Sequence, residues 1–257
     1  MVMDIQLVVV NYKTYDLLDS FIESVHHYYP ELVPNLWVVD VESDLRIVNG
    51  VIPTQHVTYI RNVGYAKACN DVAAESDSEF IAFFNSDTKF INDTCIPTCI
   101  ESFDDPAVGA VGPKQIGDGV ITHAGIVGSN ENPQHRGWRS PLIGEFNDVV
   151  ECVTVSGAAY FVRRSAWDKL TECDIYQRVF PEVNGAFLPT KLYYEETGCS
   201  YHMRDHGYKI LYNGNAVMVH RWDGSAKAGH TGNKHAVNES KQIFGNFCDA
   251  HDIAWNR

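Results

Sequence analysis

Short apolar runs alternate with segments of helical periodicity over roughly the first 110 residues of the chain. Four apolar runs predict buried strands: residues 5–11, 36–40, 56–60 and 80–87. Between them, apolar residues recur at helical spacing from Leu17 to Val25, with Thr14 as the expected N-cap, and the alanine-rich segment 62–76 turns at Gly64 into a second helix. This alternation predicts a doubly wound α/β fold around a mostly parallel sheet.

The second half of the chain has longer connections between its predicted elements. Residues 114–150 contain many glycines, prolines and asparagines and few periodic runs. After them the pattern predicts a strand, a small-residue turn and a strand over 150–164, a helix that ends near Gly207 and is followed by a strand, a further strand over 215–222, and a C-terminal helix that includes Phe244. No internal repeat or low-complexity linker separates these parts, so we expect one continuous α/β domain.

Composition and charge exclude several classes of protein. With 257 residues, 45% of them hydrophobic, the chain can bury a sizeable core. It has no run of about 18 apolar residues, so we expect no transmembrane helix, and its N-terminus lacks the basic segment of a signal peptide. The formal net charge of -13, without a cluster of lysine or arginine, argues against general nucleic-acid binding and against adhesion to anionic membranes.

The seven cysteines are scattered in apolar contexts. An odd number in such positions favours free thiols in a reducing compartment over a disulfide framework. We therefore expect a cytoplasmic protein, in the host cytoplasm if the chain is viral.

Two acidic residues stand at the ends of apolar strands. Asp40 ends the predicted strand 36–40, and Asp87 ends the strand 80–87. Ligands of doubly wound sheets bind beyond the carboxyl ends of the strands, and hard divalent cations prefer carboxylate oxygens. An acid at this edge can hold a metal ion against the phosphates of a nucleotide, although each acid taken singly is also typical of a turn or a helix cap.

Three further segments place reactive groups at the boundaries of predicted elements. The turn at Gly64 lets the backbone approach a ligand just before a helix N-terminus, where anions bind. Glu195 and Glu196 stand at a predicted helix start and are candidates for a general base, with favourable helix charge as the alternative. His220 ends a strand and is a candidate metal ligand, although a lone histidine is more often structural.

Seven segments of the chain, in this order, resemble the inverting glycosyltransferases of family 2 with the GT-A fold, and most of all their bacterial rhamnosyltransferase-like branch. They are "VVVNYKTYDLLDSFIESV", "WVVDVESD", "RNVGYAKACNDVA", "FIAFFNSDTKF", "VTVSGAAYFVRRSAW", "YYEETGCSYHMRDHGYKILY" and "AVMVHRWDGS". Together they cover most of residues 5–225. No segment is decisive alone, but seven in register make the resemblance strong.

The resemblance implies a fold and a division of the chain. We expect a nucleotide-diphospho-sugar transferase of GT-A type, with a mostly parallel central sheet flanked by helices, as a single domain over residues 1–257. Residues 1–112 would form the nucleotide-binding half and 113–225 the acceptor and catalytic half. Residues 226–257 would form a C-terminal tail with a helix.

The resemblance also implies a metal site and a catalytic base. "NSD" matches a variant of the family's DxD motif, so Asp87 is the expected ligand of Mn²⁺ or Mg²⁺, with Asn85 in place of the first acid. His220 matches a histidine that often completes this metal site. Glu195 and Glu196 match the family's Glu-Asp pair, whose second member is usually the base, so Glu196 is the expected base.

Donor binding is expected to involve residues from both halves. The candidates that match by position are Asp40, Asp44, Asn62, Gly64, Asn70, Asn85, Ser156, Gly157 and Arg204. The sequence departs from the family at two places. Glu196 replaces an aspartate and reaches one methylene further, and Gly198 stands where the family often has an aspartate, which leaves the choice between Glu195 and Glu196 open.

These roles imply a metal-dependent inverting glycosyltransferase that moves a hexosyl or deoxyhexosyl group from a UDP-, dTDP- or GDP-linked donor to a hydroxyl of a glycan or other acceptor. The alternatives are an inactive GT-A protein that binds carbohydrate or nucleotide, a transferase acting on modified DNA or protein, and a nucleotidyltransferase. The last is disfavoured because no glycine-rich basic loop follows the first strand. A homo-oligomer is compatible with the sequence.

Overall fold

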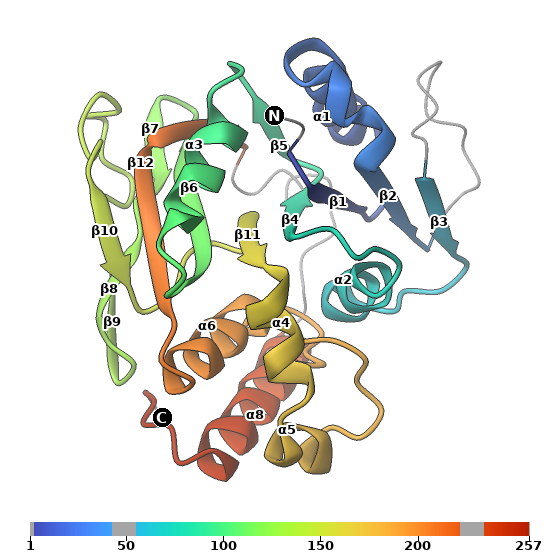
Figure 1. Cartoon of the computed structure of the whole chain (residues 1–257), viewed down its shortest axis with the longest axis vertical. Coiled ribbons are helices and arrows are strands. Elements are labelled where there is room, and N and C mark those ends of the chain that lie inside the picture. The colour runs from blue at the N-terminus through green and yellow to red at the C-terminus, as the bar shows by residue number, and fades with distance from the viewer. Residues whose placement is uncertain (1–2, 43–54, 222–233, 257) are drawn as a thin grey trace.

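A ten-stranded sheet with the order β10-β12-β6-β11-β4-β1-β2-β3 forms the centre of the molecule, with β5 paired to β12 and β7 to β6 (Figure 1). The structure, a computed structural model, describes residues 3–42, 55–221 and 234–256. The strands of this sheet are β1 (Ile5–Asn11), β2 (Leu36–Val41), β3 (Gln55–Tyr59), β4 (Phe80–Asn85), β5 (Thr88–Phe90), β6 (Val108–Gly117), β7 (Val120–His123), β10 (Val149–Cys152), β11 (Ala159–Arg163) and β12 (Lys209–His220).

Strands β3, β2, β1 and β4 pair in parallel and form one half of the sheet. The first strand is buried over its whole length, as its continuous apolar run predicts for a strand covered on both faces. In its pairing register, Asn11 lies opposite Asp40 and Val10 lies opposite Asn85. The carboxyl ends of β1, β2 and β4 therefore meet at one edge of the sheet.

The other strands make the sheet mixed. β11 is antiparallel to both β4 and β6, whereas β12 pairs in parallel with β6. We expected two strands between residues 209 and 222, but β12 is a single strand with a register shift after Asn213. Its last residue, His220, pairs with Thr88 of β5 and so reaches the edge where β4 ends.

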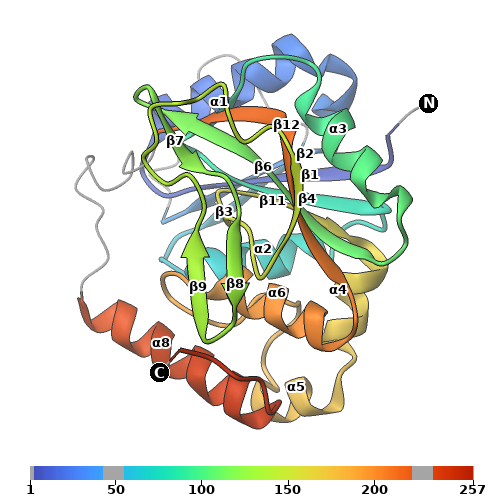
Figure 2. The same cartoon turned by 90° about the vertical axis from the view of Figure 1, so that its left-hand side faces the viewer.

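The glycine- and proline-rich segment after β6 contains more regular structure than its composition predicted. β7 returns antiparallel to β6, and β8 (Ile126–Ser129) and β9 (Asn132–His135) form a separate hairpin. These strands have only four residues each, which is too short for an alternating pattern to be recognised. The hairpin tip lies beside helix α6 (Figure 2), where the Tyr201 hydroxyl donates a hydrogen bond to the carbonyl oxygen of Asn130.

Helices cover both faces of the sheet. They are α1 (Tyr15–Tyr28), α2 (Tyr65–Ala73), α3 (Cys95–Glu101), α4 (Arg164–Thr171), α5 (Asp174–Val179), α6 (Glu195–Asp205) and α8 (Lys234–Ala250), with the short 3-10 helices η1 (Pro30–Asn35) and η2 (Ser102–Asp104). α1 and α3 pack on one face and α2, α4 and α6 on the other. α5 and α8 form an outer layer against α6 (Figure 1).

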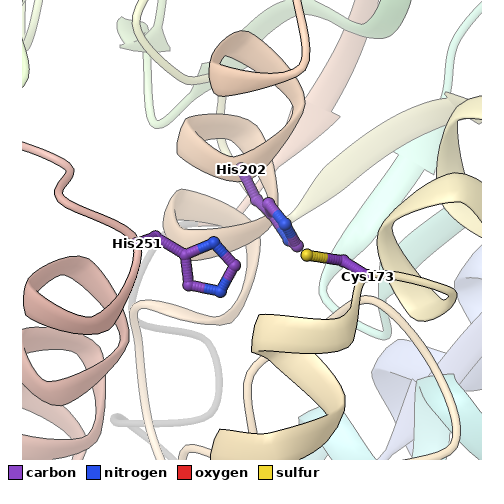
Figure 3. A group of neighbouring side chains, drawn as sticks. All are labelled: Cys173, His202 and His251. Carbon is purple, nitrogen blue, oxygen red and sulfur yellow. The ribbon is translucent and has the colours of Figure 1, made fainter.

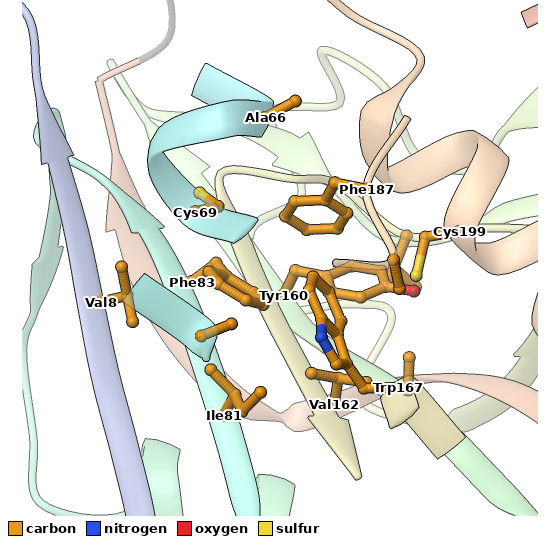
Figure 4. Packing of buried hydrophobic residues seen from close by; sticks show 14 of the residues in the cluster. Val8, Ala66, Cys69, Ile81, Phe83, Tyr160, Val162, Trp167, Phe187 and Cys199 are labelled. Carbon is orange, nitrogen blue, oxygen red and sulfur yellow. The ribbon is translucent and has the colours of Figure 1, made fainter. Parts of the chain in front are cut away.

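Alternate residues of β1 supply the two cores. Leu7 and Val9 face α1, whereas Val8 points to the opposite face of the sheet, which α2 covers at this strand. Figure 4 shows the second core, where Phe187 packs against Phe83 at a ring distance of 4.8 Å and against Trp167 at 5.1 Å. The loop that carries Phe187 leads directly to α6, so this aromatic contact helps to fix the start of that helix.

The sequence predicted most of these elements correctly. The α/β architecture with a mostly parallel central sheet is confirmed, and so is the C-terminal helix, here α8. Helix α5 was missed because six residues are too few to show a helical period. Thr14 does occupy the N-cap position of α1, but its side chain makes no capping hydrogen bond. Within the described ranges, no helix is both long enough and apolar enough to cross a bilayer.

Close packing of β6 against β12 gives a first testable prediction. A Cβ atom at Gly117 would overlap the carbonyl oxygen of His220. We expect Gly117→Ala to push these strands apart and to lower the free energy of unfolding by about 1–3 kcal/mol, as overpacking does. Urea titration followed by circular dichroism measures the change. Gly144→Ala, whose Cβ would meet nothing within 4 Å, is the control, and equal stability of both variants would contradict the prediction.

Candidate active site

A network of buried polar side chains lies along the edge where β1, β2 and β4 end. Asn11 donates from Nδ2 to Asp40 Oδ1 at 2.8 Å, and the Tyr15 hydroxyl donates to Asp40 Oδ2 at 3.1 Å. Asp40 is only 1% exposed, so these two donors compensate part of the free energy that burying a carboxylate requires. They also fix the orientation of the acid at the end of β2.

Asn11 also connects this acid to the end of β4. Its Oδ1 accepts hydrogen bonds from the backbone N–H and the hydroxyl of Thr14, at 3.2 and 2.9 Å. The Thr14 hydroxyl lies 2.7 Å from the hydroxyl of Ser86, the residue before Asp87. Thr14 therefore holds the ends of two strands together, which explains why its side chain does not cap α1.

Asp87 and His220 come together from two different strands. Asp87 follows β4 and is 7% exposed, and its Oδ1 lies 3.5 Å from His220 Nε2. His220 Nδ1 donates to Gln115 Oε1 at 2.9 Å, which leaves the lone pair on Nε2, the nitrogen nearer the carboxylate. Burial lowers the pKa of His220 to about 4. The imidazole is therefore neutral near pH 7 and can act as a ligand.

This pair fits a divalent cation. Two ligand atoms bound to one ion at about 2.1–2.2 Å lie roughly 3–3.6 Å apart, which matches the separation of 3.5 Å between Asp87 Oδ1 and His220 Nε2. Mixed oxygen and imidazole ligation suits Mn²⁺ among other ions. The hydrogen bond from His220 Nδ1 to Gln115 is the kind of outer contact that fixes the tautomer of a metal-binding histidine. Both residues expected at the metal site are therefore side by side.

A second series of contacts links the metal candidates to the turn between β10 and β11. Gln115 pairs with His123 across β6 and β7. His123 Nε2 accepts a hydrogen bond from the backbone N–H of Ser156 at 3.3 Å. Burial lowers the pKa of His123 to about 3, so its ring stays neutral and keeps a lone pair for this bond. Ser156 and the predicted small-residue turn are thus attached to the same strands as the metal candidates.

Gly157, in this turn, lies against the carboxyl group of Glu196. A Cβ atom at position 157 would be 3.1 Å from Cδ and 3.3 Å from Oε2 of Glu196, so a larger residue would push the carboxyl group away. The Gly157 carbonyl accepts the Tyr65 hydroxyl at 3.1 Å, and the next carbonyl, of Ala158, accepts the backbone N–H of Asn85 at 3.1 Å. The turn therefore joins the end of β4, the start of α2 and the start of α6.

The backbone before α6 holds its two carboxyl groups in different surroundings. Tyr193 and Tyr194 both adopt left-handed backbone conformations, with φ of 65° and 71°, which is uncommon for residues other than glycine and recurs at functional sites. Glu195 Oε2 accepts the Thr190 hydroxyl at 3.0 Å. Glu195 is therefore tied to the preceding loop, and Glu196 is the member of the pair that faces Gly157.

Burial raises the pKa of both carboxyl groups. The pKa of Glu196 rises to about 8, first because burial disfavours the carboxylate and second because the charge of Glu195 lies next to it. Burial also raises the pKa of Glu195, while hydrogen bonds that include the one from Thr190 oppose this rise. The proton affinity of Glu196 is therefore higher than that of an ordinary glutamate, as general bases working near neutral pH require.

The segment before α2 lies close to the loop before α6. Gly64 has a φ of 81° and starts α2, and Asn62 Oδ1 accepts its N–H at 2.9 Å. A Cβ atom at Gly64 would lie 3.7 Å from the carbonyl oxygen of Thr190. Asn70 makes two hydrogen bonds to the backbone of Phe187, at 2.9 and 3.1 Å. Asn70 thus holds the loop before α6, and its part in donor binding stays a prediction.

Two other candidates are not joined to this cluster by the described contacts. Arg204 lies eight residues after Glu196, about 12 Å further along the axis of α6, and its guanidinium donates to Asn130 Oδ1 at the hairpin tip. Asp44 lies outside the described residues. The donor contacts expected for both residues stay predictions.

Sequence reasoning missed several residues that hold the site together: Asn11, Tyr65, Gln115 and His123. Asn11 ends an apolar strand just as Asn85 does, and this shared position was a usable signal. The sequence contains no such signal for the other three residues, because their contacts join segments that are far apart in the sequence.

Comparison with known proteins gives a match to one family. The model described as "Glycosyl transferase family 2" matches residues 6–170. This range includes Asp40, Asp87 and Gly157 and ends before Glu196 and His220. No curated protein matches the sequence significantly. The match does not distinguish branches of the family, so the rhamnosyltransferase-like branch stays a prediction.

Solved structures of glycosyltransferases have a similar fold. A mannosyltransferase from Pyrobaculum calidifontis, in complex with GDP-Man and Mn²⁺, has a TM-score of 0.56 at 14% identity, covering 96% of this chain and 73% of that one. TarS 1-349 from S. aureus, with UDP-GlcNAc, has a TM-score of 0.61 at 16% identity, with 96% and 66% covered. Glucosyl-3-phosphoglycerate synthase from Mycobacterium tuberculosis, with Mn²⁺, UDP and phosphoglyceric acid, has 0.57 at 16% identity, with 97% and 79% covered. At these identities the likeness shows the GT-A fold alone.

The raised pKa of Glu196 predicts how stability depends on pH. In the unfolded chain this carboxyl group titrates near its ordinary pKa of 4.5, but in the folded protein it titrates near 8. Between these values the folded state binds the extra proton, so stability falls as pH rises from about 4.5 through about 8. Glu196→Gln removes this contribution. We expect the melting temperature of the variant to exceed that of the wild type by a margin that grows over this pH range.

Thermal melts at a series of pH values measure this margin. Glu182→Gln changes a carboxyl group on an exposed residue and is the matched control. A margin that stays constant with pH, or that shrinks, would show that Glu196 is not the buried titrating group.

Proposed function

The chain belongs to glycosyl transferase family 2, and we propose that it is a metal-dependent, inverting glycosyltransferase that moves a hexosyl or deoxyhexosyl group from a nucleotide-diphosphate sugar to an acceptor hydroxyl in glycan synthesis. The observation that carries this proposal is the pairing of two chemical groups at one edge of the sheet. A neutral histidine and a carboxylate suited to a divalent cation lie there. Contacts through Gln115, His123 and Ser156 connect them to a carboxyl group with a raised pKa.

The donor is the first half of this proposal. The similar solved structures contain GDP-Man or UDP-GlcNAc, or UDP with Mn²⁺, which supports a nucleotide-diphosphate sugar here too. We propose that Asp40 contacts the nucleotide, because Asn11 and Tyr15 hold its carboxylate at the carboxyl edge of the sheet, where ligands of such sheets bind. Asn62 and Gly64 would add backbone and amide contacts at the N-terminus of α2.

Asp87 and His220 would hold the metal ion, Mn²⁺ or Mg²⁺, with Gln115 fixing the imidazole of His220. When bound, the ion would neutralise the diphosphate that leaves with the nucleotide. The two side chains supply only part of a coordination shell, and oxygens of the donor can complete it. Asn85, which is uncharged, adds no further carboxylate to this shell.

Glu196 would act as the general base. Its carboxylate takes the proton from the acceptor hydroxyl as the acceptor oxygen forms a bond to the anomeric carbon. The bond from that carbon to the diphosphate oxygen breaks, and its electron pair leaves with the nucleotide diphosphate. A single displacement of this kind inverts the configuration at the anomeric carbon. Gly157 makes room for the carboxyl group, and Thr190 holds Glu195 aside.

The acceptor would bind near the loop between β9 and β10. This loop is joined to β7 by backbone hydrogen bonds from Ile121 to Ser140 and from Arg139 to Ile121. Ile121 lies two residues before His123. The loop exposes Trp138 and Leu142, whose side chains are 38% and 54% exposed. Sugars stack on aromatic rings, so an exposed indole in this position suits a glycan acceptor.

The base assignment predicts a loss of turnover without a loss of donor binding. Removing a general base typically lowers the rate about 10²- to 10⁴-fold, so we expect Glu196→Gln to reduce turnover by this factor. Release of nucleotide diphosphate from a panel of UDP-, dTDP- and GDP-sugars measures the effect. Glu195→Gln is the matched control. If it loses turnover instead, the base is Glu195. If the wild type turns over none of the donors but binds them, the alternative of an inactive binding protein is favoured.

The metal assignment predicts a change in binding. Isothermal titration of wild-type protein with UDP or GDP should show tighter binding in the presence of Mn²⁺ than in its absence. We expect Asp87→Asn and His220→Ala each to remove this gain, because each deletes one of two protein ligands. Asp93→Asn, an acid outside the site, should leave it unchanged. Metal-dependent binding that survives both substitutions would refute this site.

A further inference from the structure

Cys173, His202 and His251 form a second cluster of metal-binding side chains, away from the candidate active site (Figure 3). Cys173 precedes α5, His202 lies in the last turn of α6, and His251 directly follows α8. One ligand atom of each residue lies within 4.8 Å of the other two. Three segments that are distant in the sequence thus bring one sulfur and two imidazoles to a single point.

His202 is the buried centre of this cluster. Its side chain is fully buried, and neither ring nitrogen has a hydrogen-bond partner in the part of the chain that the structure describes. A neutral imidazole offers one N–H donor and one lone pair, and buried polar atoms of this kind are nearly always satisfied. The rings of Tyr176 and Phe247 pack at 5.5 and 5.4 Å from the imidazole, which keeps it from turning toward solvent. The lone pair of this imidazole is therefore available to bind a metal ion.

His251 also has a buried ring nitrogen without a hydrogen-bond partner among the described residues. The residue is 8% exposed, and this nitrogen is Nε2. Its ring centre lies 4.5 Å from that of His202. Burial lowers the pKa of both histidines, so each keeps a lone pair near neutral pH. Cys173, in contrast, is the one cysteine of the seven that is not fully buried, so the cluster lies close to the surface on the side of this residue.

We propose that Cys173, His202 and His251 bind one Zn²⁺ ion, with a water molecule as the fourth ligand. Zinc takes thiolate sulfur at about 2.3 Å and imidazole nitrogen at about 2.0–2.1 Å, so ligand atoms of a tetrahedral site lie roughly 3.3–3.6 Å apart. Small side-chain rotations that move the ligand atoms by about 1 Å bring them to these separations. The Cys173 thiol releases its proton to solvent as the metal binds.

The ligands decide which metal the cluster binds. Thiolate and imidazole favour zinc, whereas the carboxylate and imidazole of Asp87 and His220 also suit harder ions such as Mn²⁺. The zinc ion would tie the start of α5, the end of α6 and the segment after α8 to one point, and so stabilise the outer layer of helices. This proposal is independent of the proposed sugar transfer and can fail without affecting it.

Metal analysis of the full chain tests this proposal. After incubation with ZnCl₂ and dialysis into metal-free buffer, the wild type should retain about one zinc ion per chain by inductively coupled plasma mass spectrometry. Cys173→Ser and His251→Ala should each retain far less. His235→Ala, which changes an exposed histidine of α8, and His220→Ala should retain as much as the wild type. No zinc in the wild type, or loss only in His220→Ala, would overturn the proposal.

Cobalt substitution identifies the sulfur ligand directly. Wild-type protein loaded with Co²⁺ should show a thiolate-to-cobalt charge-transfer band in the near ultraviolet, and Cys173→Ser should lack it. Because Cys173 is not buried, its replacement by serine should leave the fold intact, which far-ultraviolet circular dichroism checks. Chelation should lower the melting temperature of the wild type and leave that of Cys173→Ser unchanged. A band that persists in Cys173→Ser would overturn the assignment.

Discussion

The register of the parallel strands β4, β1 and β2 is the constraint on which the rest of the candidate site depends. Asn11 lies opposite Asp40, and Asn85 lies one position further back, opposite Val10. A shift by one residue would turn each of these side chains to the other face of the sheet. The apolar residues behind them, which fill cores on both faces, therefore also fix the position of the polar groups at the strand ends.

Burial then sets the chemistry of those groups. A histidine in water titrates near pH 6.5, but burial holds His220 and His123 neutral, one as a candidate ligand and the other as an acceptor for Ser156. Burial acts in the opposite direction on Glu196, whose pKa rises because the charged form is disfavoured. A site of this kind lowers the stability of the fold in order to supply bases and ligands at neutral pH, which is a common property of functional sites.

The sequence was sufficient for features that depend on local pattern, and insufficient for those that depend on pairing. Continuous apolar runs identified β1 and β4, and the acids at the ends of two predicted strands singled out Asp40 and Asp87 as candidates. The pairing of β12 with β5 and β6, which brings His220 to Asp87, joins segments more than 100 residues apart. No local pattern encodes it, so only the family resemblance suggested that these two residues share a site. Gln115, which contacts His220 across β6 and β12, was missed for the same reason, and His123 was missed because its partner Ser156 is 33 residues away.

Helix α6 links the candidate active site to the proposed zinc site. Its first turn carries Glu196, and its last turn carries His202. The middle of the helix is held by packing, because Gly198 to Met203 are buried and the Ser200 hydroxyl contacts the hydroxyls of Thr154 and Tyr160 at 3.0 and 3.1 Å. Contacts at its two ends add to this packing: Gly157 and Thr190 at the start, and the histidine cluster at the end. A metal ion at the last turn would restrain the axis of the helix whose first turn presents the candidate base, about 9 Å away along that axis. The position of the candidate base would then depend in part on a ligand set at the other end of the same helix.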